Sequence, residues 1–516
     1  MGPAAFSGRC HEPTLGGHPR AGEEIRTGNR RKATCPHDHS HMLGEYHIAG
    51  DSEVQSAIDA ALEAGHNWAL KPWYDRVAVF LKAADLLAGQ YRQVLNAATM
   101  LGQSKNVFQA EIDAACELVD FLRFNAYFAS QIYAEQPDSG PEEWNRMDYR
   151  PLEGFVFAVT PFNFTAIGGN LPSSAAMMGN TVVWKPASSA AYSAAHIMRV
   201  FQEAGLPPGV INLVYGSGPT IGDPVLRHPN LAGVHFTGST DVFRHMWSAV
   251  GQNIAEYRTY PRLVGETGGK NFVVVHSSAD LDVVATALGR GAFEYQGQKC
   301  SAASRAYVPS SSWPALWEKL SAQLESMRIG PPTDFRNFVN AVINQSAFDK
   351  ITRYIEYARQ AGDAEIIAGG GYDDSDGYFI EPTVILTENP GFLTMREEIF
   401  GPVLTIMPYN DDEYDRILDE VDATSPYALT GSVIARDRDA IDRALHRLRN
   451  AAGNFYINDK PTGAVVGRQP FGGARASGTN DKAGSRWNLM RWISPRTIKE
   501  NMIPPTDFRY PFMQEE

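Results

Sequence analysis

The sequence predicts an α/β fold of two units, each built around an open and largely parallel sheet. Its 516 residues exceed what one hydrophobic core usually holds, so two or three structural units are expected. From Gly154 onward, short apolar runs alternate with amphipathic segments, which is the pattern of repeated strand–helix–strand units. A second series of the same kind follows Cys300. The two series therefore predict two α/β units of comparable size.

Helices come first in the predicted order, from Val54 to about Tyr133, because Ala, Leu and Phe recur there at three- and four-residue spacing. A polar stretch from Pro137 to Pro151 then interrupts the pattern. The first predicted series of strands comprises FVFAVTPFNF, TVVWKP, GVINLVYG, LAGVHFTG, RLVGETGG and FVVVHSS, and the second comprises AYVP, GPVLTIMPY, LTGSVIA and GNFYIN. Ligands of open parallel sheets bind beyond the carboxyl ends of the strands, so the chemistry is expected in the loops after these runs.

The composition bears on partners and location. The net charge is −13 and no basic stripe is present, so no nucleic-acid partner is expected. No apolar run reaches the roughly 18 residues of a membrane span, and the start lacks the order of a secretory signal. We expect an intracellular protein without a membrane partner, cytoplasmic or, in a eukaryote, in the mitochondrial matrix. Residues 1–24 resemble neither an ordered element nor a good mitochondrial presequence, and they are expected to be poorly ordered.

The cysteines and histidines do not predict a metal centre. The four cysteines are widely spaced and form no CxxC, which disfavours a thioredoxin-type pair, a zinc ribbon and a disulfide scaffold. The run PHDHSH at residues 36–41 places His37, His39 and His41 on one face of an extended strand. A metal site and a polar edge near a mobile terminus both fit this run. We favour the polar edge, and no metal is predicted.

Cys300 stands in the stretch EYQGQKCSAAS, where small residues surround a scarce thiol. A buried structural cysteine is the usual role of this residue type. Here Gly297 relieves crowding of the backbone, and Ser301 and Ala302 are small enough to leave room for a ligand. A nucleophile requires such conditions. No neighbouring His base is evident, so a cysteine-protease pair is not indicated.

Two strand ends carry polar groups that suit catalysis. GETGGK at 265–270 does not meet the pattern of a phosphate-binding P-loop, but it places Glu266 beside three glycines. A general base and a plain surface-loop acid are the two interpretations of this residue. PFNF at 161–164 places the Asn163 amide between two aromatic rings, where it suits an oxyanion hole. Asn163 also opens a glycosylation sequon, which we discount for an intracellular enzyme.

A further strand end suits phosphate binding. FTGSTDVF at 236–243 ends a strand with Gly238, Ser239 and Thr240 just before a helix. Backbone N–H groups and a hydroxyl at such a place can hold a pyrophosphate, and the same residues equally suit a simple helix N-cap. GSGPTIG at 216–222 is one residue too long for the dinucleotide fingerprint.

Seven motifs taken in order resemble the aldehyde dehydrogenase superfamily: PFNF, WKPAS, FTGST, ETGGKN, GQKCSA, EEIFGP and PFGG. The match extends from about residue 25 to the end of the sequence. The resemblance implies a Rossmann-like cofactor domain, a catalytic domain and a small β arm for homo-oligomerisation. The implied boundaries are 44–134 and 152–267 for the NAD-binding domain, 268–458 for the catalytic domain, and 135–151 with 459–516 for the arm and C-terminal segment.

The resemblance also implies covalent catalysis on a small aldehyde. Cys300 would attack the aldehyde carbon, Asn163 and the Cys300 N–H would hold the oxyanion, and Glu266 would activate the hydrolytic water. The implied cofactor is NAD, and the residues implied to bind it are Thr160, Lys185, Gly238, Ser239, Thr240, Glu398 and Phe400. Ser188 stands where many NAD-specific relatives carry an acid that repels a 2′-phosphate, so the charge pattern also admits NADP.

Other stretches are most similar to the branch of the superfamily that oxidises L-glutamate γ-semialdehyde to L-glutamate in proline breakdown. They include QAEIDAACELVDFLRFN and FYINDKPTGAVVGRQPFGGARASGTNDK. In this branch the residues implied to bind substrate are Ser301, Gly463 and Ala464 at the carboxylate, and Phe164 and Phe471 around the methylenes. Glu117 is a candidate for the ammonium, with a helix-surface carboxylate as the alternative. Two alternative functions stay open. The protein could oxidise another aldehyde with NAD or NADP, or it could be a catalytically silent structural or binding relative.

Overall fold

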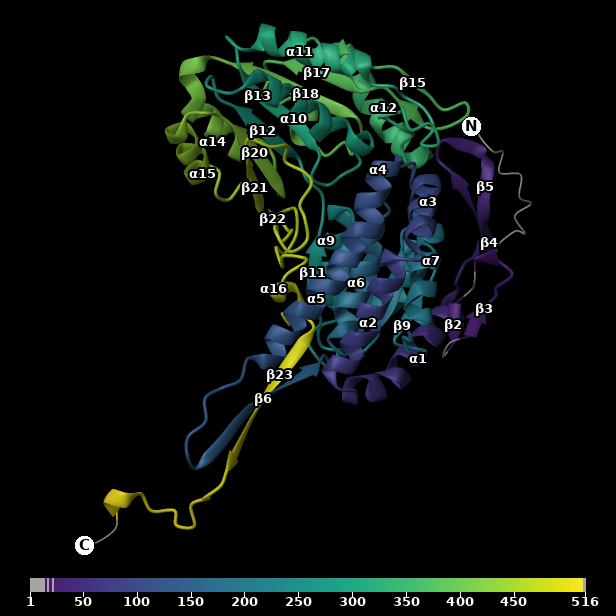
Figure 1. Ribbon diagram of the computed structural model, residues 1–516, viewed down its shortest axis with the longest axis vertical. Helices are drawn as coiled ribbons and strands as arrows, with labels where there is room; N and C mark the ends of the chain where they lie inside the picture. Colours follow the sequence, from purple (N-terminus) through teal and green to yellow (C-terminus); the bar gives the residue numbers. More distant parts are fainter. Residues whose placement is uncertain (1–13, 16–17, 21–22, 514–516) are drawn as a thin grey trace.

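The computed structural model describes residues 14–15, 18–20 and 23–513. Figure 1 shows two α/β bodies, one above the other, and a thin two-stranded arm that leaves the lower body. The lower body holds a five-stranded sheet and the upper body a seven-stranded sheet. The prediction of two α/β units is confirmed. We retain the division near residue 267 as a proposal.

A layer of helices precedes the first sheet, as the periodicity predicts. Its members are α1 (Asp51–Leu70), α2 (Trp73–Ala88), α3 (Arg92–Gln103), α4 (Val107–Ala110), the π-helical turn η1 (Glu111–Cys116) and α5 (Glu117–Ala134). Ser104 ends α3 in the left-handed region, with φ 55°. The Asn106 side chain caps α4 by accepting the N–H of Gln109. A π-helical turn widens the helix locally and is frequent at functional sites.

The five-stranded sheet of the lower body is parallel throughout, in the order β11-β10-β7-β8-β9. Its strands are β7 (Phe155–Thr160), β8 (Thr181–Pro186), β9 (Ile211–Leu213), β10 (Leu231–Thr237) and β11 (Arg262–Glu266). Its connections are α6 (Thr165–Met177), η2 (Ser188–Ala190), α7 (Ala191–Glu203), α8 (Gly218–Arg227) and α9 (Thr240–Gln252). Every residue of β8 and β10 is buried, because helices cover both faces of the sheet. This explains why the strands appear as continuous apolar runs.

The seven-stranded sheet of the upper body has the order β14-β17-β18-β13-β12-β20-β21 and is parallel except at β14. Its strands are β12 (Asn271–Val275), β13 (Ala303–Pro309), β14 (Ala364–Ala368), β17 (Thr383–Thr387), β18 (Val403–Tyr409), β20 (Thr430–Ile434) and β21 (Asn454–Ile457). The helices of this body are α10 (Leu281–Phe293), η3 (Glu294–Gly297), α11 (Trp313–Ser326), α12 (Gln345–Gln360), α13 (Leu393–Arg396), η4 (Asp411–Glu413), α14 (Tyr414–Thr424) and α15 (Arg438–Arg447).

One predicted strand lies in the other sheet. The run FVVVHSS was expected to close the first series, but its strand β12 pairs with β13 and β20 in the upper body. The prediction was wrong because an apolar run carries no mark of the sheet it joins. The chain passes between the bodies at Thr267–Lys270, immediately after Glu266.

The arm consists of β6 (Glu143–Pro151) and β23 (Ile493–Asn501), which pair antiparallel along their whole length. Figure 1 shows this arm, and the segment that follows β23, projecting away from both bodies. The remaining elements are β1 (Thr14–Leu15), β2 (His18–Arg20), β3 (Glu23–Ile25), β4 (Arg30–Cys35), β5 (Asp38–His47), β15 (Tyr372–Asp373), β16 (Phe379–Ile380), β19 (Tyr427–Ala428), β22 (Ala474–Arg475), α16 (Arg486–Met490) and η5 (Pro511–Met513). The predicted disorder of residues 1–24 falls mostly outside the described residues.

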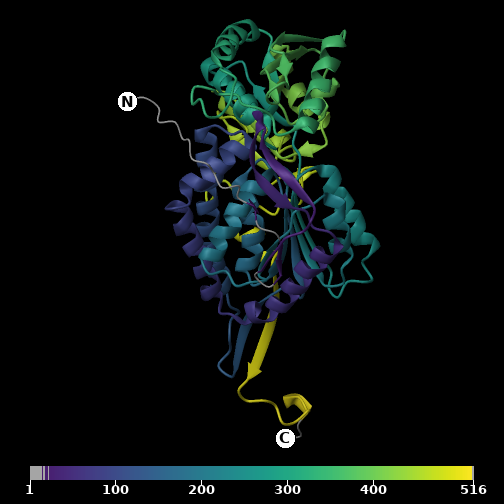
Figure 2. The same cartoon turned by 90° about the vertical axis from the view of Figure 1, so that its right-hand side faces the viewer.

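The histidine run forms a contact between the bodies and does not lie at a free edge. Figure 2 shows β4 and β5 running along the lower body toward the upper one. The Tyr378 N–H donates to the Pro36 carbonyl at 3.0 Å, and His37 Nδ1 lies 3.2 Å from the Ser104 hydroxyl. The His39 ring packs against the Tyr378 ring at a tilt of 48°, with centroids 4.2 Å apart. The polar-edge interpretation was therefore wrong, because the ends of the hairpin are buried by residues far away in the sequence.

Two features of the described part of the chain concern membrane insertion and metal binding. None of its helices combines the length and apolarity of a membrane-spanning segment. Within the same residues, no three side chains of the metal-binding types gather at one place.

Candidate active site

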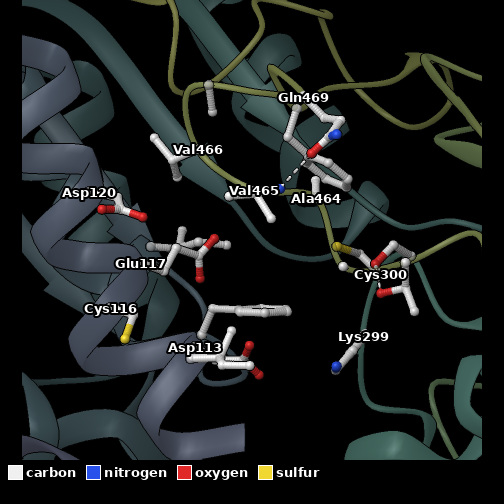
Figure 3. A pocket seen from close by; sticks show the side chains of 18 of the residues that line it. Asp113, Cys116, Glu117, Asp120, Lys299, Cys300, Ala464, Val465, Val466 and Gln469 are labelled. Carbon is white, nitrogen blue, oxygen red and sulfur yellow. Dashed lines mark hydrogen bonds between the residues drawn. The ribbon is translucent and has the colours of Figure 1, made fainter.

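A cavity of about 390 Å³ lies where the two bodies and the C-terminal loop of residues 460–471 meet. Figure 3 shows Cys300 on one side of it, and Asp113 and Glu117 facing it from the helical layer. The residues predicted from the sequence that line this cavity are Cys300, Glu266, Ser301, Gly463, Ala464, Phe164, Phe471 and Glu117. Asn163 does not line it, but the Asn163 Nδ2 donates to the Gln298 carbonyl at 3.1 Å, two residues before Cys300.

The loop that carries Cys300 has an unusual backbone. Tyr295, Gln296 and Gly297 follow one another with positive φ of 51°, 55° and 65°. Non-glycine residues in this region are strained and persist only where surrounding contacts hold them. Gly297 is required because a Cβ there would lie 2.1 Å from the Gly401 carbonyl oxygen. The loop is thus tightly fixed immediately before Cys300.

The Cys300 side chain is buried against the cavity, with 9% of the residue exposed. The Asn271 amide donates to the Cys300 carbonyl at 2.7 Å and so holds the main chain. Burial, together with the carboxylates of Glu266 and Glu398, holds the pKa of the Cys300 thiol well above its usual range. The thiol is therefore protonated at neutral pH before ligands enter. The interpretation as a purely structural cysteine does not explain why the residue lines the cavity.

Glu266 ends β11 at the passage between the bodies. Its Oε1 is buried and has no hydrogen-bond partner among the protein atoms. Burial raises the pKa of Glu266 to about 8, and the nearby Lys482 opposes this shift. A carboxyl group with this pKa exchanges protons readily near neutral pH. The surface-loop interpretation of Glu266 was wrong.

Asn163 follows β7 and is 4% exposed. A buried amide of this kind cannot accept a glycan, so discounting the sequon was correct. The hydrogen bond from Nδ2 to the Gln298 carbonyl fixes this amide against the loop that carries Cys300.

The residues predicted to bind the cofactor adenosine and pyrophosphate lie at the carboxyl edge of the five-stranded sheet. Lys185 is the penultimate residue of β8, is 9% exposed, and donates from Nζ to the Pro186 carbonyl at 3.2 Å. Burial lowers the pKa of Lys185 to about 8. The Ser239 hydroxyl caps α9 by accepting the Val242 N–H, so the N-cap interpretation of this stretch is confirmed. Thr160 accepts from the Trp184 indole at 2.9 Å.

The other predicted cofactor residues lie near the passage between the bodies. Glu398 accepts the Gly269 N–H through Oε1 at 2.8 Å. Phe400 has φ 63° and packs edge-on against Phe162, with centroids 5.9 Å apart. The Gly238 N–H donates to the Glu266 carbonyl at 3.2 Å. The Thr240 hydroxyl of α9 donates to the Ala476 carbonyl at 3.2 Å.

The residues predicted to bind substrate form one wall of the cavity. Ser301 Oγ lies 2.7 Å from the Thr462 hydroxyl. Gly463 lines the cavity and has φ 97°, a conformation that favours glycine. Phe471 exchanges two backbone hydrogen bonds with Ala483, of 3.0 and 2.7 Å. These contacts hold the loop rigidly beside Cys300.

Glu117 lies opposite this wall and not on the helix surface. Its Oε2 is buried without a protein partner. Burial, with Asp113 nearby, raises the pKa of Glu117 well above its usual range. The helix-surface interpretation was wrong, because helical spacing alone does not say which face meets the cavity.

Sequence reasoning did not single out the other charged residues at this site. The cavity is also lined by Asp113, Asp120, Arg290, Glu294, Lys299 and Lys460. Behind it, the Lys105 Nζ donates to Asp113 Oδ2 at 2.6 Å. The four-residue spacing between Asp113 and Glu117 was an available signal, because it places both on one helix face. Lys299 is adjacent to Cys300. No local signal marks Lys105.

Comparisons with known proteins agree with this geometry. The model of the aldehyde dehydrogenase family matches residues 25–498. A Schizosaccharomyces pombe protein described as a probable delta-1-pyrroline-5-carboxylate dehydrogenase is 51% identical, over 95% of this chain and 90% of its own. The human mitochondrial delta-1-pyrroline-5-carboxylate dehydrogenase is 49% identical, over 95% of this chain and 88% of its own.

A solved structure gives the same result. The delta-pyrroline-5-carboxylate dehydrogenase of Mycobacterium tuberculosis, bound with NAD, superposes with a TM-score of 0.93. It is 55% identical and covers 97% of this chain and 92% of its own. The resemblance inferred from the motifs is confirmed, and the fold is the aldehyde dehydrogenase fold. The chain belongs to the aldehyde dehydrogenase family.

Proposed function

We propose that the protein oxidises L-glutamate γ-semialdehyde, which is in equilibrium with Δ1-pyrroline-5-carboxylate, to L-glutamate with NAD as oxidant. This is the second step of proline breakdown. The observation that carries the proposal is a single cavity that brings together the Cys300 thiol, the Glu266 carboxyl and the glycine-bearing wall at Gly463. The relatives described as delta-1-pyrroline-5-carboxylate dehydrogenases support the choice of substrate.

The first chemical step belongs to Cys300. The thiol gives its proton to solvent water, and the sulfur then attacks the aldehyde carbon, which forms a C–S bond and turns the carbonyl oxygen into an oxyanion. The Asn163 amide and the Cys300 N–H stabilise this oxyanion. Loss of a hydride from the same carbon then leaves a thioester on Cys300.

Glu266 serves the second step. In its ionised form it takes a proton from water as the water attacks the thioester carbon, and the C–S bond breaks to release the carboxylic acid and the thiolate. The buried and unpartnered Oε1 suits this task, because no protein donor competes with the water.

The residues present fit NAD. The buried Lys185 ammonium donates to the Pro186 carbonyl and has further N–H groups for ribose hydroxyls. The N-terminus of α9 at Ser239 and Thr240 suits pyrophosphate. Glu398 and Phe400 would hold the nicotinamide ribose, and Thr160 and Gly238 border the same edge of the sheet. When bound, NAD supplies the hydride acceptor. The M. tuberculosis relative is described as bound with NAD, which supports NAD over NADP.

The wall of the cavity suits an α-amino acid. Ser301 and the N–H groups of Gly463 and Ala464 would bind the substrate carboxylate, as backbone donors can approach an anion closely where side chains are small. Glu117 would bind the ammonium from the opposite side. Phe164 and Phe471 would enclose the methylenes between them, because both line the cavity.

The direct test is NADH formation. We expect the wild-type protein to produce NADH with glutamate semialdehyde, and Cys300→Ala to produce none above background. A far better rate with acetaldehyde would overturn the substrate but leave the aldehyde dehydrogenase activity. Absence of NADH with both aldehydes would overturn the proposed function.

The assembly and location are also proposals. We propose a homo-oligomer, a dimer or larger, because the arm and the segment that follows it bear exposed apolar side chains such as Trp144 and Ile503, 50% and 64% exposed. We propose a cytoplasmic location, or the mitochondrial matrix in a eukaryote. Relatives from Dictyostelium discoideum and Bos taurus are described as mitochondrial.

A further inference from the structure

Lys105 is a buried cation that the proposed chemistry does not use. It lies just after α3, its side chain has 0% exposure, and it does not line the cavity. Burial lowers the pKa of Lys105, and Asp113 opposes that shift. Burying an ammonium costs several kcal/mol unless it is paired, so a residue of this kind calls for a reason.

The contacts of Lys105 supply the charge compensation. Its Nζ donates to Asp113 Oδ2 at 2.6 Å and lies 4.3 Å from the ring centroids of both Phe164 and Tyr295. Cation–π contacts of this length favour the charged form, and desolvation strengthens them. The ammonium is thus held between two aromatic faces and a carboxylate.

Each of the two rings lies close in the sequence to one donor of the proposed oxyanion hole. Phe164 directly follows Asn163, which supplies the side-chain donor from the lower body. Tyr295 opens the strained loop that leads to Cys300, which supplies the backbone donor. The halves meet directly where the Asn163 amide donates to the Gln298 carbonyl at 3.1 Å.

The residue before Lys105 makes contacts to the same loop. The Gln296 side-chain amide donates to the Ser104 carbonyl at 3.2 Å and to the Ala341 carbonyl at 2.9 Å. The Ala341 N–H donates to the Ser104 hydroxyl at 3.2 Å. Ser104, Tyr295 and Gln296 all have positive φ and are fully buried. Two strained segments therefore hold each other, and the Lys105 ammonium lies at their junction.

We propose that Lys105 is a positioning residue that keeps the two oxyanion donors, the Asn163 amide and the Cys300 N–H, in fixed register. It acts through Phe164 and Tyr295 and touches neither substrate nor cofactor. The inference rests on the proposed function, because it assumes that these donors stabilise an oxyanion.

The test compares Lys105→Met and Lys105→Arg with the wild type, using the first-turnover rate of NADH formation. Propanal is used beside glutamate semialdehyde, because an uncharged substrate reports on the oxyanion hole and not on the charge of Asp113. A misplacement of about 1 Å can cost about 100-fold, so Lys105→Met is expected to be slower by roughly that factor with both aldehydes. Lys105→Arg keeps the cation between the rings and is expected to stay within about fivefold. Lys82→Met removes an exposed lysine from α2 and should change nothing.

A double-mutant cycle with Asn163→Ala separates positioning from general damage. If Lys105 acts through this donor, Lys105→Met should slow Asn163→Ala by less than about threefold, since the two effects share one interaction. Full multiplication of the two effects would overturn the proposal. So would a Lys105→Met protein within about threefold of wild type, or a Lys105→Arg protein as slow as Lys105→Met.

Three further outcomes are distinguishable. If the wild type forms no NADH with either aldehyde, the proposed function fails and not only the role of Lys105. If the wild type is active and Asn163→Ala matches it, the proposed function stands and the oxyanion role of Asn163, with the role of Lys105, is overturned. If Lys105→Met does not fold, Lys105→Gln replaces it in every comparison, because glutamine still donates to Asp113 but places no charge between the rings.

Discussion

Single residues around Cys300 have properties set mainly by burial. The cavity removes Cys300, Glu266 and Glu117 from water, and each has a raised pKa as a result. Groups of this kind change protonation when charged ligands arrive. The raised pKa values favour the neutral form of each of these three groups.

The pKa of Glu266 predicts how hydrolysis of the thioester depends on pH. Only the ionised carboxylate can act as base, so the rate should rise with pH through about 8. At pH 7 about one tenth of Glu266 is ionised, and hydrolysis should run at about one tenth of its plateau. The single-turnover rate of thioester hydrolysis between pH 6 and 10 measures this. A rate that is flat across that range would contradict the role of Glu266.

Lys482 offers a check on the sign of this dependence. Because Lys482 lowers the pKa of Glu266, Lys482→Met should raise that pKa and move the profile to higher pH. Lys482→Arg keeps the charge and should leave the midpoint in place. A midpoint that moves to lower pH in Lys482→Met would refute the electrostatic explanation.

Gly463→Ala tests whether the cavity wall at Gly463 binds the substrate carboxylate. With φ 97°, it occupies a conformation that strains alanine by about 1–3 kcal/mol. We expect Gly463→Ala to raise KM for glutamate semialdehyde about tenfold and to leave kcat/KM for propanal within about twofold, since propanal has no carboxylate. Gly362→Ala, where a Cβ meets nothing within 4 Å, is the matched control. Equal losses with both aldehydes would show that the wall does not select the carboxylate.

The candidate catalytic residues were easier to identify from the sequence than the residues that hold them in place. Cys300, Glu266 and Asn163 are recognisable because each lies in a local motif at a strand or helix end. Lys105 has no such motif, since its burial depends on Phe164 and Tyr295, which are distant in the sequence. Glu117 was ambiguous for a related reason: helical periodicity finds the buried face but not the cavity within it.

At the scale of elements, the loop of η3 decides the geometry of the site. It turns the chain through three consecutive left-handed residues between α10 and Cys300. Its shape is fixed by contacts with the α3–α4 connection and with Gly401. A small displacement of this loop would therefore move the Cys300 thiol as well.

Gly297→Ala tests this element. The new Cβ would lie 2.1 Å from the Gly401 carbonyl oxygen, so the loop must move. We expect kcat to fall by about 100-fold or more while the helical content seen by circular dichroism is unchanged. Gly205→Ala is the control, because it has φ 96° but meets nothing within 4 Å. Equal activity of the two variants would show that the loop geometry does not limit catalysis.

The prediction of elements succeeded where burial produced long apolar runs, as in β8 and β10. It omitted β14 and β17 of the upper sheet, and the hairpin of β4 and β5. The edge strand β14 and the β4–β5 hairpin are half exposed, so their sequences lack the continuous apolar pattern. β17 is paired on both sides and largely buried, but its apolar run is only five residues long. The β12 strand was recognised but placed in the wrong series, because sheet membership depends on distant pairing.

At the scale of the whole molecule, the arm is the feature that a single chain leaves unexplained. A two-stranded ribbon is marginally stable alone in water. The arm and the segment after it carry exposed apolar residues including Trp144, Met502 and Ile503. Contact with another copy would cover them.

Ile503→Asp tests this assembly. A charge in a buried contact should weaken the oligomer, so the mass measured by light scattering should fall toward that of one chain, 56.7 kDa. The melting temperature of the separated chain should change little, because Ile503 is 64% exposed within it. Val94→Asp, on the exposed face of α3, is the control. An unchanged mass would place the contact elsewhere.

The central claim is that glutamate semialdehyde is oxidised as a thioester on Cys300 that Glu266 hydrolyses. Mass spectrometry of Glu266→Gln, mixed with NAD and glutamate semialdehyde, tests it most directly. We predict an acyl adduct that accumulates on the peptide containing Cys300 and is absent from the wild type at steady state. No adduct, or an adduct on Cys116 or another residue, would contradict the account.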